Sequence, residues 1–278
     1  MSNNINKWKS ITPFSMLKPV QEFLADRRKS HTVYPKPEDI LNIFKFTDPD
    51  DIKIVIVGQD PYPSEHADGL AFSSKEKNTP VSLENIFKEI YNNVGAFYRG
   101  YPFEEYFPTN NLEIWAKKGI LLLNRVMSVD KGEPTSHAGK GWEEFTGKIL
   151  SVINNSNKPT VFMLWGNYAK ASLSLLDNPI HSVLTGVHPA ARDKYSFAGN
   201  RHFIQALNFL LINERVGKPF DYTKTINKEH ALKGLKHFAE CMEYDDDWYN
   251  KNKVIIEQER LILVTESIVE FFTTNKNL

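Results

Sequence analysis

The carboxylate of Asp60 follows a short apolar run and is the first candidate for chemistry in this chain. Residues 54–57 read Ile-Val-Ile-Val, a β-branched run typical of a strand that is buried on both faces. Gly58 ends the run, and Pro61 favours a turn because its ring pushes Asp60 out of helical geometry. In an open α/β sheet, ligands bind at the carboxyl ends of the strands. We therefore interpret Asp60 as a possible base at such an edge.

Three further strand-like runs end in small or polar residues. These are Asn124 after 119–123, Trp165-Gly166-Asn167 after 159–164, and Gly186-Val187-His188-Pro189 after 181–185. Because parallel strands end at the same edge, their tips could meet in one pocket. The pocket would then contain Asp60 as a possible base and Tyr62 as an aromatic wall. Asn124 would offer an amide that recognises a ligand by hydrogen bonds, and His188 an imidazole donor.

Each of these residues also has a plainer explanation. Asp60 and Asn124 could be turn residues, His188 could lie in a surface loop, and Phe72 could be a core residue. The inference therefore rests on their coincidence at one edge and on no single residue.

Strands and helices alternate between residues 20 and 220. We expect helices near 17–28, 82–94, 110–117, 142–155, 166–176 and 200–212, and strands at 53–57, 119–123, 159–164 and 181–185. This alternation predicts an α/β fold, a three-layer α/β/α sandwich with a central four-stranded parallel sheet.

Composition narrows the class of protein. The chain has 278 residues, of which 41% are hydrophobic and 24% charged, as is typical of a globular protein. Its formal net charge is zero, so any positive surface that binds nucleic acid must be a local patch. No apolar run is long enough to span a bilayer, and the N-terminus has no signal-peptide core. Cys241 is the only cysteine, which excludes an intramolecular disulfide. We expect an intracellular, cytoplasmic protein without a membrane partner, or a nuclear one if its source is eukaryotic or viral.

The last part of the chain differs from the rest. From Asp221 onward it is modestly acidic, with Asp245-Asp246-Asp247 between two apolar stripes at helical spacing. We predict a catalytic domain over residues 1–220 and a helical C-terminal extension over 221–278.

The order of several motifs resembles that of the main uracil-excising family of uracil-DNA glycosylases, from roughly Trp8 to Pro219. The motifs are Gly58-Gln59-Asp60-Pro61-Tyr62, Gly69-Leu70-Ala71-Phe72-Ser73, Ser82-Leu83-Glu84-Asn85-Ile86, Leu121-Leu122-Leu123-Asn124, Ser136-His137 with Gly141-Trp142-Glu143, Leu164-Trp165-Gly166, His188-Pro189 and Arg201-His202-Phe203.

The resemblance implies a DNA repair enzyme that flips uracil out of single- or double-stranded DNA and hydrolyses its bond to deoxyribose, without a metal or organic cofactor. It implies that Asp60 and His188 are catalytic. Uracil would be bound by Gln59, Tyr62, Phe72 and Asn124. DNA would be contacted at Pro80, Ser82, Gly166, Asn167, Ala190 and Arg192. A small DNA-mimicking inhibitor protein is a possible partner, as is a replication or repair protein bound by the C-terminal extension.

The chain departs from the family pattern at three places. Pro63 stands where the family usually has His, and the loop from there to Gly69 is one residue shorter. The usual Pro-Ser-Pro-Leu after the catalytic His, whose Leu wedges into the base stack, reads Pro-Ala-Ala-Arg at 189–192, which looks like the poxvirus branch. Arg192 could fill the gap by stacking or contact only phosphate. Asn167 replaces a common Ser.

Two alternatives remain open at this point. The poxvirus-like loop and the extension would suit a glycosylase-fold adaptor for a replication polymerase, with catalysis secondary. The short 63–68 loop could instead reshape the pocket for another modified pyrimidine.

Overall fold

The computed structural model describes residues 3–95, 103–191, 197–213, 215 and 272, which belong to two compact units. The first unit comprises Met1–Asn85 and Thr109–Phe197, and the second comprises Ile86–Pro108 and Ala198–Leu278. In chain order the elements are α1 (Asn3–Ile11), η1 (Phe14–Leu17), α2 (Lys18–Arg27), β1 (Val33–Tyr34), α3 (Asn42–Phe46), η2 (Pro49–Asp51), β2 (Ile54–Gly58), α4 (Val81–Gly95), α5 (Phe103–Tyr106), α6 (Glu113–Lys117), β3 (Ile120–Asn124), β4 (Val129–Asp130), α7 (Trp142–Asn154), β5 (Val161–Trp165), α8 (Asn167–Lys170), η3 (Leu173–Leu175), β6 (Ser182–Gly186) and α9 (His202–Ile212).

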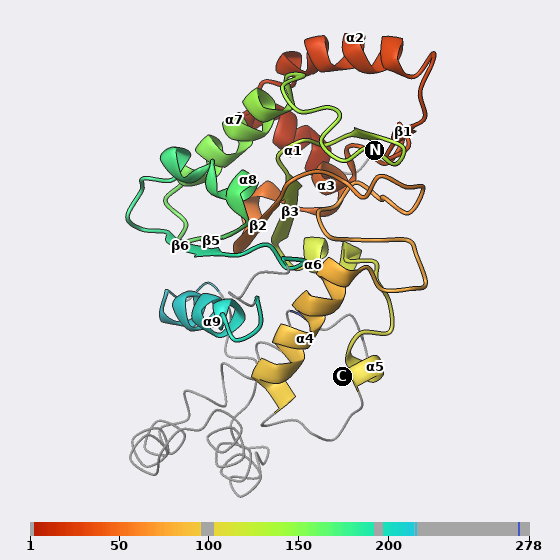
Figure 1. The fold of residues 1–278 in the computed structure, drawn as a ribbon. Coiled ribbons are helices and arrows are strands. Elements are labelled where there is room, and N and C mark those ends of the chain that lie inside the picture. Colours follow the sequence, from red (N-terminus) through yellow and green to blue (C-terminus); the bar gives the residue numbers. More distant parts are fainter. Residues whose placement is uncertain (1–2, 96–102, 192–196, 214, 216–271, 273–278) are drawn as a thin grey trace, which may run out of the picture. The chain divides into compact units, whose positions relative to one another are not determined.

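A parallel sheet with the strand order β3-β2-β5-β6 forms the centre of the first unit (Figure 1). Ile54 at the start of β2 lies opposite Ile120 of β3 and Val161 of β5. All residues of these three strands are buried, whereas β6 at the edge is partly exposed. Apolar side chains on both faces of β2, β3 and β5 therefore build the core of this unit.

Helices of the first unit flank this sheet. α3 and α6 pack on β3, and α8 packs on β5 and β2. α1 is anchored by Trp8, whose ring is fully buried and whose Nε1 donates a hydrogen bond to the carbonyl oxygen of Thr47 at 2.9 Å. The predicted α/β fold with a four-stranded parallel sheet between helices is confirmed. None of the described helices is long and apolar enough to cross a membrane.

The predicted element boundaries need several corrections. Each sheet strand ends one residue later than predicted and begins one residue later, or two in the case of β5, so that Gly58 and Asn124 are strand residues. The helix expected over 166–176 is broken into α8 and η3, and α6 begins only at Glu113. The sequence analysis missed α1, α3, α5 and the short antiparallel pair β1 and β4.

Glu89 joins two segments within the second unit. Its buried carboxylate accepts hydrogen bonds from the backbone N–H groups of Gly199 (2.6 Å) and Arg201 (3.0 Å). In the same unit, the rings of Phe203 and Phe272 meet edge to face at 4.7 Å. Apart from Phe272, the proposed extension lies outside the described residues, so the boundary at residue 220 and the two apolar stripes stay predictions.

Gly69 is required by a close approach of two backbone segments. It has a φ of +87°, and a Cβ atom there would lie 1.9 Å from the carbonyl oxygen of Asp39. Gly139 has a φ of +70°, but a Cβ atom there would meet nothing within 4 Å.

We expect Gly139→Ala to lower the free energy of unfolding by about 1–2 kcal/mol, the cost of a left-handed alanine. Gly69→Ala should lower it by clearly more, because backbone must also move. Urea unfolding of both variants measures the difference, and equal losses would contradict the close approach.

Candidate active site

A pocket of about 420 Å³ lies at the carboxyl ends of β2 and β3. Most residues that the sequence predicted for a site line it, although they come from five separate segments of the first unit. The lining residues are Gly58, Gln59, Asp60, Pro61, Tyr62, Pro63, Phe72, Pro80, Val81, Ser82, Asn124, Pro134, His188 and Ala190.

Gly58 of β2 and Asn124 of β3 are neighbours across these two paired strands. A Cβ atom on Gly58 would lie 2.3 Å from Oδ1 of Asn124. The backbone N–H groups of Arg125 and Val126 donate to the carbonyl oxygens of Gly58 (3.0 Å) and Gln59 (2.9 Å). Because Gly58 has no side chain, the Asn124 amide has room in the pocket. The backbone of Gly58 belongs to β2, which is paired with β3 on one side and β5 on the other.

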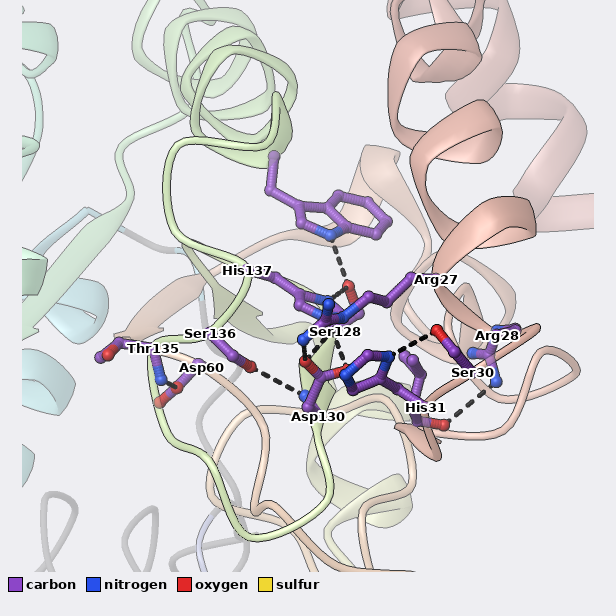
Figure 2. Close-up of polar contacts among 12 residues, drawn as sticks. Arg27, Arg28, Ser30, His31, Asp60, Ser128, Asp130, Thr135, Ser136 and His137 are labelled. Atoms are coloured by element: carbon purple, nitrogen blue, oxygen red, sulfur yellow. Dashed lines mark hydrogen bonds and ion pairs between the residues drawn. The ribbon is translucent and has the colours of Figure 1, made fainter.

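The Asp60 carboxylate is held by one donor on each oxygen. The backbone N–H of Thr135 donates to Oδ2 at 2.6 Å (Figure 2), and Nε2 of Gln59 donates to Oδ1 at 3.1 Å. A carboxylate oxygen can accept more than one hydrogen bond. Asp60 can therefore still accept a hydrogen bond from water or a ligand in the pocket.

Tyr62 is a rigid, neutral wall. Its hydroxyl donates to the carbonyl oxygen of Phe72 at 3.3 Å and shares a hydrogen bond of 2.8 Å with Oγ of Ser82. Burial raises the pKa of Tyr62 to about 12. The phenol is therefore un-ionised at neutral pH, and the side chain cannot swing aside without breaking both contacts.

Phe72 lies in a left-handed backbone conformation (φ 64°) with its ring at the pocket. The ring is 5.7 Å from that of Trp165 and 6.0 Å from that of His188, centre to centre. Phe72 is 9% exposed, which makes it both a core residue and a possible stacking surface. The stacking role of Phe72 stays a prediction.

A buried carboxyl group, which the sequence analysis missed, supports the turn before Phe72. Asp68 accepts hydrogen bonds from Oγ of Ser73 (2.5 Å) and from the backbone N–H of Leu70 (3.2 Å). Burial raises the pKa of Asp68 to about 6. Its neighbour Gly69 is a sequence signal that could have indicated the turn, because glycine readily adopts the positive φ that tight turns require.

The proton of neutral His188 is fixed on one ring nitrogen. The backbone N–H of Ala190 donates to Nδ1 at 3.1 Å, so Nδ1 is the acceptor and Nε2 carries the proton. Burial lowers the pKa of His188, and the charge of Asp60 partly opposes this. A neutral imidazole can thus donate a hydrogen bond through Nε2. The loop is fixed further by Asn85, whose Nδ2 donates to the carbonyl oxygen of Pro189 at 2.7 Å.

Several predicted contact residues lie elsewhere or cannot be placed. Gly166 and Asn167 do not line the pocket. A Cβ atom on Gly166 would instead lie 3.1 Å from Cβ of His188, so this glycine gives the imidazole its room. Arg192 lies outside the described residues, and its wedge role stays a prediction.

Val81 is a lining residue that the sequence analysis missed. It begins α4 and is 63% exposed, so an apolar side chain stands at the mouth of the pocket. Across the described ranges, no group of three or more His, Cys, Asp or Glu side chains could hold a metal ion.

The fold and the pocket define an α/β protein with a carboxylate and an imidazole in one pocket at the carboxyl edge of a parallel sheet. The family model described as the uracil DNA glycosylase superfamily matches residues 44–211. The chain belongs to this family.

Curated relatives agree with the family match. The chain is 41% identical over 208 residues to the uracil-DNA glycosylase of Clostridium perfringens, which covers 73% of this chain and 87% of the relative. It is 39% identical over 229 residues to that of a Geobacillus species, covering 78% and 96%.

Solved structures share the fold at lower identity. Mimivirus uracil-DNA glycosylase gives a TM-score of 0.60 at 22% identity and covers 75% of this chain and 81% of its own. A mimivirus UNG variant in complex with UGI gives 0.61 at 24% identity and covers 74% and 88%. The likeness of the loop at 189–192 to the poxvirus branch stays a hypothesis.

The electrostatic coupling of His188 to Asp60 can be measured. We expect the pKa of His188 in the wild type to lie below the ordinary imidazole value of about 6.5. Asp60→Asn should lower it further, because the variant removes the negative charge that favours the imidazolium. An NMR titration of the ring protons measures both pKa values. His181, a second histidine whose pKa burial lowers, serves as the control and should titrate identically in both proteins. A higher His188 pKa in Asp60→Asn would contradict the coupling.

Proposed function

We propose that this uracil-DNA glycosylase excises uracil with Asp60, Tyr62, Phe72, Asn124 and His188 as its working side chains. The activity is that of its family: hydrolysis of the bond between uracil and deoxyribose in DNA, the first step of base excision repair. The observation that carries the residue assignment is that these five side chains line one pocket. Its volume of about 420 Å³ lies in the range of small-ligand sites.

The base must leave the helix before any of these residues can touch it. Glycosylases flip their target nucleotide into a pocket, at an unstacking cost of a few kcal/mol. Phe72 would stack on the flipped base, and base–aromatic stacking contributes about 1–3 kcal/mol. Contacts of the protein to the flanking phosphates must offset the remainder.

Asn124 would distinguish uracil from cytosine. Its N–H₂ group donates to O4 of uracil, and its carbonyl oxygen accepts from N3–H. Cytosine presents the reverse pattern, a donor at N4 and an acceptor at N3. Buried polar groups would then be left unpaired, which rejects cytosine more strongly than a loose fit does.

Tyr62 would exclude thymine. We place its ring beside C5 of the bound base, where the methyl group of thymine would collide with it. The two hydrogen bonds of its hydroxyl, to Ser82 and Phe72, keep the ring from moving aside. Discrimination at C5 would therefore depend on the stiffness of this ring.

Bond cleavage would use His188 and Asp60 together. The bond between the sugar carbon and uracil N1 breaks, both electrons go to the uracil ring, and the oxygen of a water molecule bonds to the sugar carbon. Nε2–H of His188 donates to O2, where negative charge develops. Asp60 orients the water, accepts its proton and favours the cationic sugar through its negative charge.

DNA contacts would come from the rim of the pocket. We propose that the segments at Pro80, Ser82 and Ala190 contact flanking phosphates. At the N-terminus of α4 the backbone N–H groups of Val81 and Ser82 have no acceptor inside the helix and can bind a phosphate. Pro80 has no N–H, and that of Ala190 donates to His188, so these two residues would line the phosphate site without donating to it. Gly166 and Asn167 stand further along the same sheet edge and would contact the next phosphates. Such an enzyme would act in the compartment that holds DNA, and a DNA-mimicking inhibitor protein could occupy the same surface.

The catalytic roles predict large losses from single substitutions. Asp60→Asn should slow single-turnover excision by about 10²–10⁴-fold, the usual contribution of a general base. His188→Leu should slow it by about 10²–10³-fold, the usual contribution of one donor to a developing anion. Binding of a uracil-containing oligonucleotide should be largely kept in both. A variant that excises at nearly the wild-type rate would remove its residue from the mechanism.

The specificity roles predict new products from the pocket. Asn124→Asp should release some cytosine, because a carboxyl group can accept from N4–H₂ and, when protonated, donate to N3. Tyr62→Ala should release some thymine. Tyr62→Phe is the matched control, since it keeps the ring and loses only the hydroxyl, and it should still reject thymine. Chromatography of the released bases from oligonucleotides containing uracil, thymine, cytosine or 5-substituted uracils measures this. Strict uracil specificity in active Asn124→Asp and Tyr62→Ala would refute the pocket assignment.

A further inference from the structure

The turn that holds Asp60 belongs to a buried network of polar side chains. The turn at residues 130–137 follows β4 and carries Thr135, whose backbone N–H donates to Asp60 (Figure 2). Two motifs from the family resemblance, Ser136-His137 and Trp142, lie in or next to it. The proposed mechanism uses neither of them, so their role needs a structural explanation.

Four side chains form a continuous chain of hydrogen bonds. Nε1 of Trp142 donates to Oγ of Ser128 at 2.7 Å, and Oγ of Ser128 lies 2.8 Å from Nδ1 of His137. Nε2 of His137 lies 3.1 Å from Oδ1 of Asp130. Since the indole can only donate, the serine hydroxyl is free to donate to Nδ1, and the imidazole then donates its Nε2 proton to the carboxylate.

This arrangement has the composition of a nucleophilic triad, but its burial excludes that role. Ser128 and His137 are 0% exposed and Asp130 is 2% exposed, so a substrate cannot reach the serine. Burial also lowers the pKa of His137, which agrees with a neutral ring that donates one hydrogen bond and accepts one. The network is therefore built to hold backbone in place.

Asp130 connects this network to α2. Nε and Nη2 of Arg27, the last residue of α2, donate to Oδ2 of Asp130 at 2.9 and 2.5 Å. Burial alone would raise the pKa of Asp130, but the hydrogen bonds from Arg27 and His137 hold it below its usual range. The carboxylate is thus charged, and both of its oxygens are occupied by partners 7 and 103 residues away in the sequence.

The network reaches Asp60 through the backbone of the turn. Asp130 donates its own N–H to Oγ of Ser136 at 2.9 Å, and Gly132 donates its N–H to the carbonyl oxygen of Pro63 at 2.9 Å. Thr135 has a φ of 67°, which is unusual for a β-branched residue and persists only where the surroundings impose it. The surroundings here are the Asp130 anchor on one side and the backbone of residues 60–63 on the other.

We propose that Arg27 and Asp130 are positioning residues for Asp60. They fix the turn so that the amide of Thr135 binds Oδ2, and this contact sets the direction in which the carboxylate faces the water. The proposal rests on the catalytic role of Asp60 proposed above. Without the ion pair, the turn no longer holds the Thr135 amide at a fixed position. The Asp60 carboxylate can then rotate away from the productive geometry.

The test compares Arg27→Met with a matched control in two backgrounds. Lys7→Met removes another ion-paired cation of similar exposure, because the side chains of Lys7 and Arg27 are 36% and 32% exposed, although its partners Asp48 and Asp50 are more exposed than Asp130. Each substitution is made in the wild type and in Asp60→Asn, and single-turnover excision, KM and thermal unfolding are measured for the full chain. Arg27→Lys is included as the conservative variant.

We expect Arg27→Met to lower the wild-type excision rate by on the order of 10²-fold, the cost of misplacing a catalytic group by about 1 Å, with little change in KM. In Asp60→Asn the same substitution should have almost no further effect, because there is no carboxylate left to position. Lys7→Met should leave excision unchanged in both backgrounds, and Arg27→Lys should restore most of the rate.

Other results would overturn the proposal. Equal losses from Arg27→Met in both backgrounds would mean that Arg27 supports the fold in general, and an unchanged rate would mean that the ion pair does not matter for Asp60. If Asp60→Asn itself excises normally, the proposed function fails instead.

A milder variant covers the case in which Arg27→Met does not fold. Ser136→Ala removes one hydrogen bond inside the turn and leaves the ion pair intact. The proposal requires a smaller loss of excision that again disappears in Asp60→Asn. A folded Ser136→Ala protein with the wild-type rate, or with equal losses in both backgrounds, would contradict it.

Discussion

The site depends on the parallel register of the central strand. β2 lies between β3 and β5, and this pairing sets Gly58 opposite Asn124. The two residues can lie so close only because glycine has no side chain. A slip of one residue would turn every side chain of β2 to the other face. It would also carry Asp60 and Tyr62 away from Asn124, so the buried apolar strands that build the core also determine which polar groups share a pocket.

The polar groups of the pocket are fixed before any ligand arrives. Tyr62 is tied to Ser82 and the backbone of Phe72, His188 accepts from the backbone at Ala190, and Asp60 accepts from Gln59 and Thr135. Each side chain is thus held by a protein partner and still offers a group to the pocket: the ring of Tyr62, Nε2–H of His188 and the carboxylate of Asp60. Such preorganisation reduces the free energy that must be spent on ordering the site when the base enters.

The sequence was sufficient for features that depend on local pattern. Short apolar runs marked the sheet strands to within two residues, and the parallel arrangement followed from the alternation of strands with helices. Features that depend on distant partners were out of reach. α1 is held by the hydrogen bond of Trp8 to Thr47, 39 residues away, and the ion pair of Arg27 with Asp130 joins residues 103 positions apart. The sequence also did not show that Gly166, predicted at the DNA surface, lies beside His188, because only packing reveals which neighbour a small residue makes room for.

The contact from Thr135 to Asp60 is made by main chain, and this has a consequence for how the position tolerates change. Most amino acids could supply the same N–H group, so the identity of the side chain at 135 is free to drift as long as the left-handed turn persists. The contact is instead preserved by Arg27 and Asp130, which do not touch the substrate. Sequence comparison or side-chain scanning of such an enzyme would therefore rank Thr135 as dispensable and Arg27 and Asp130 as essential. This ranking is the reverse of their order of distance from Asp60.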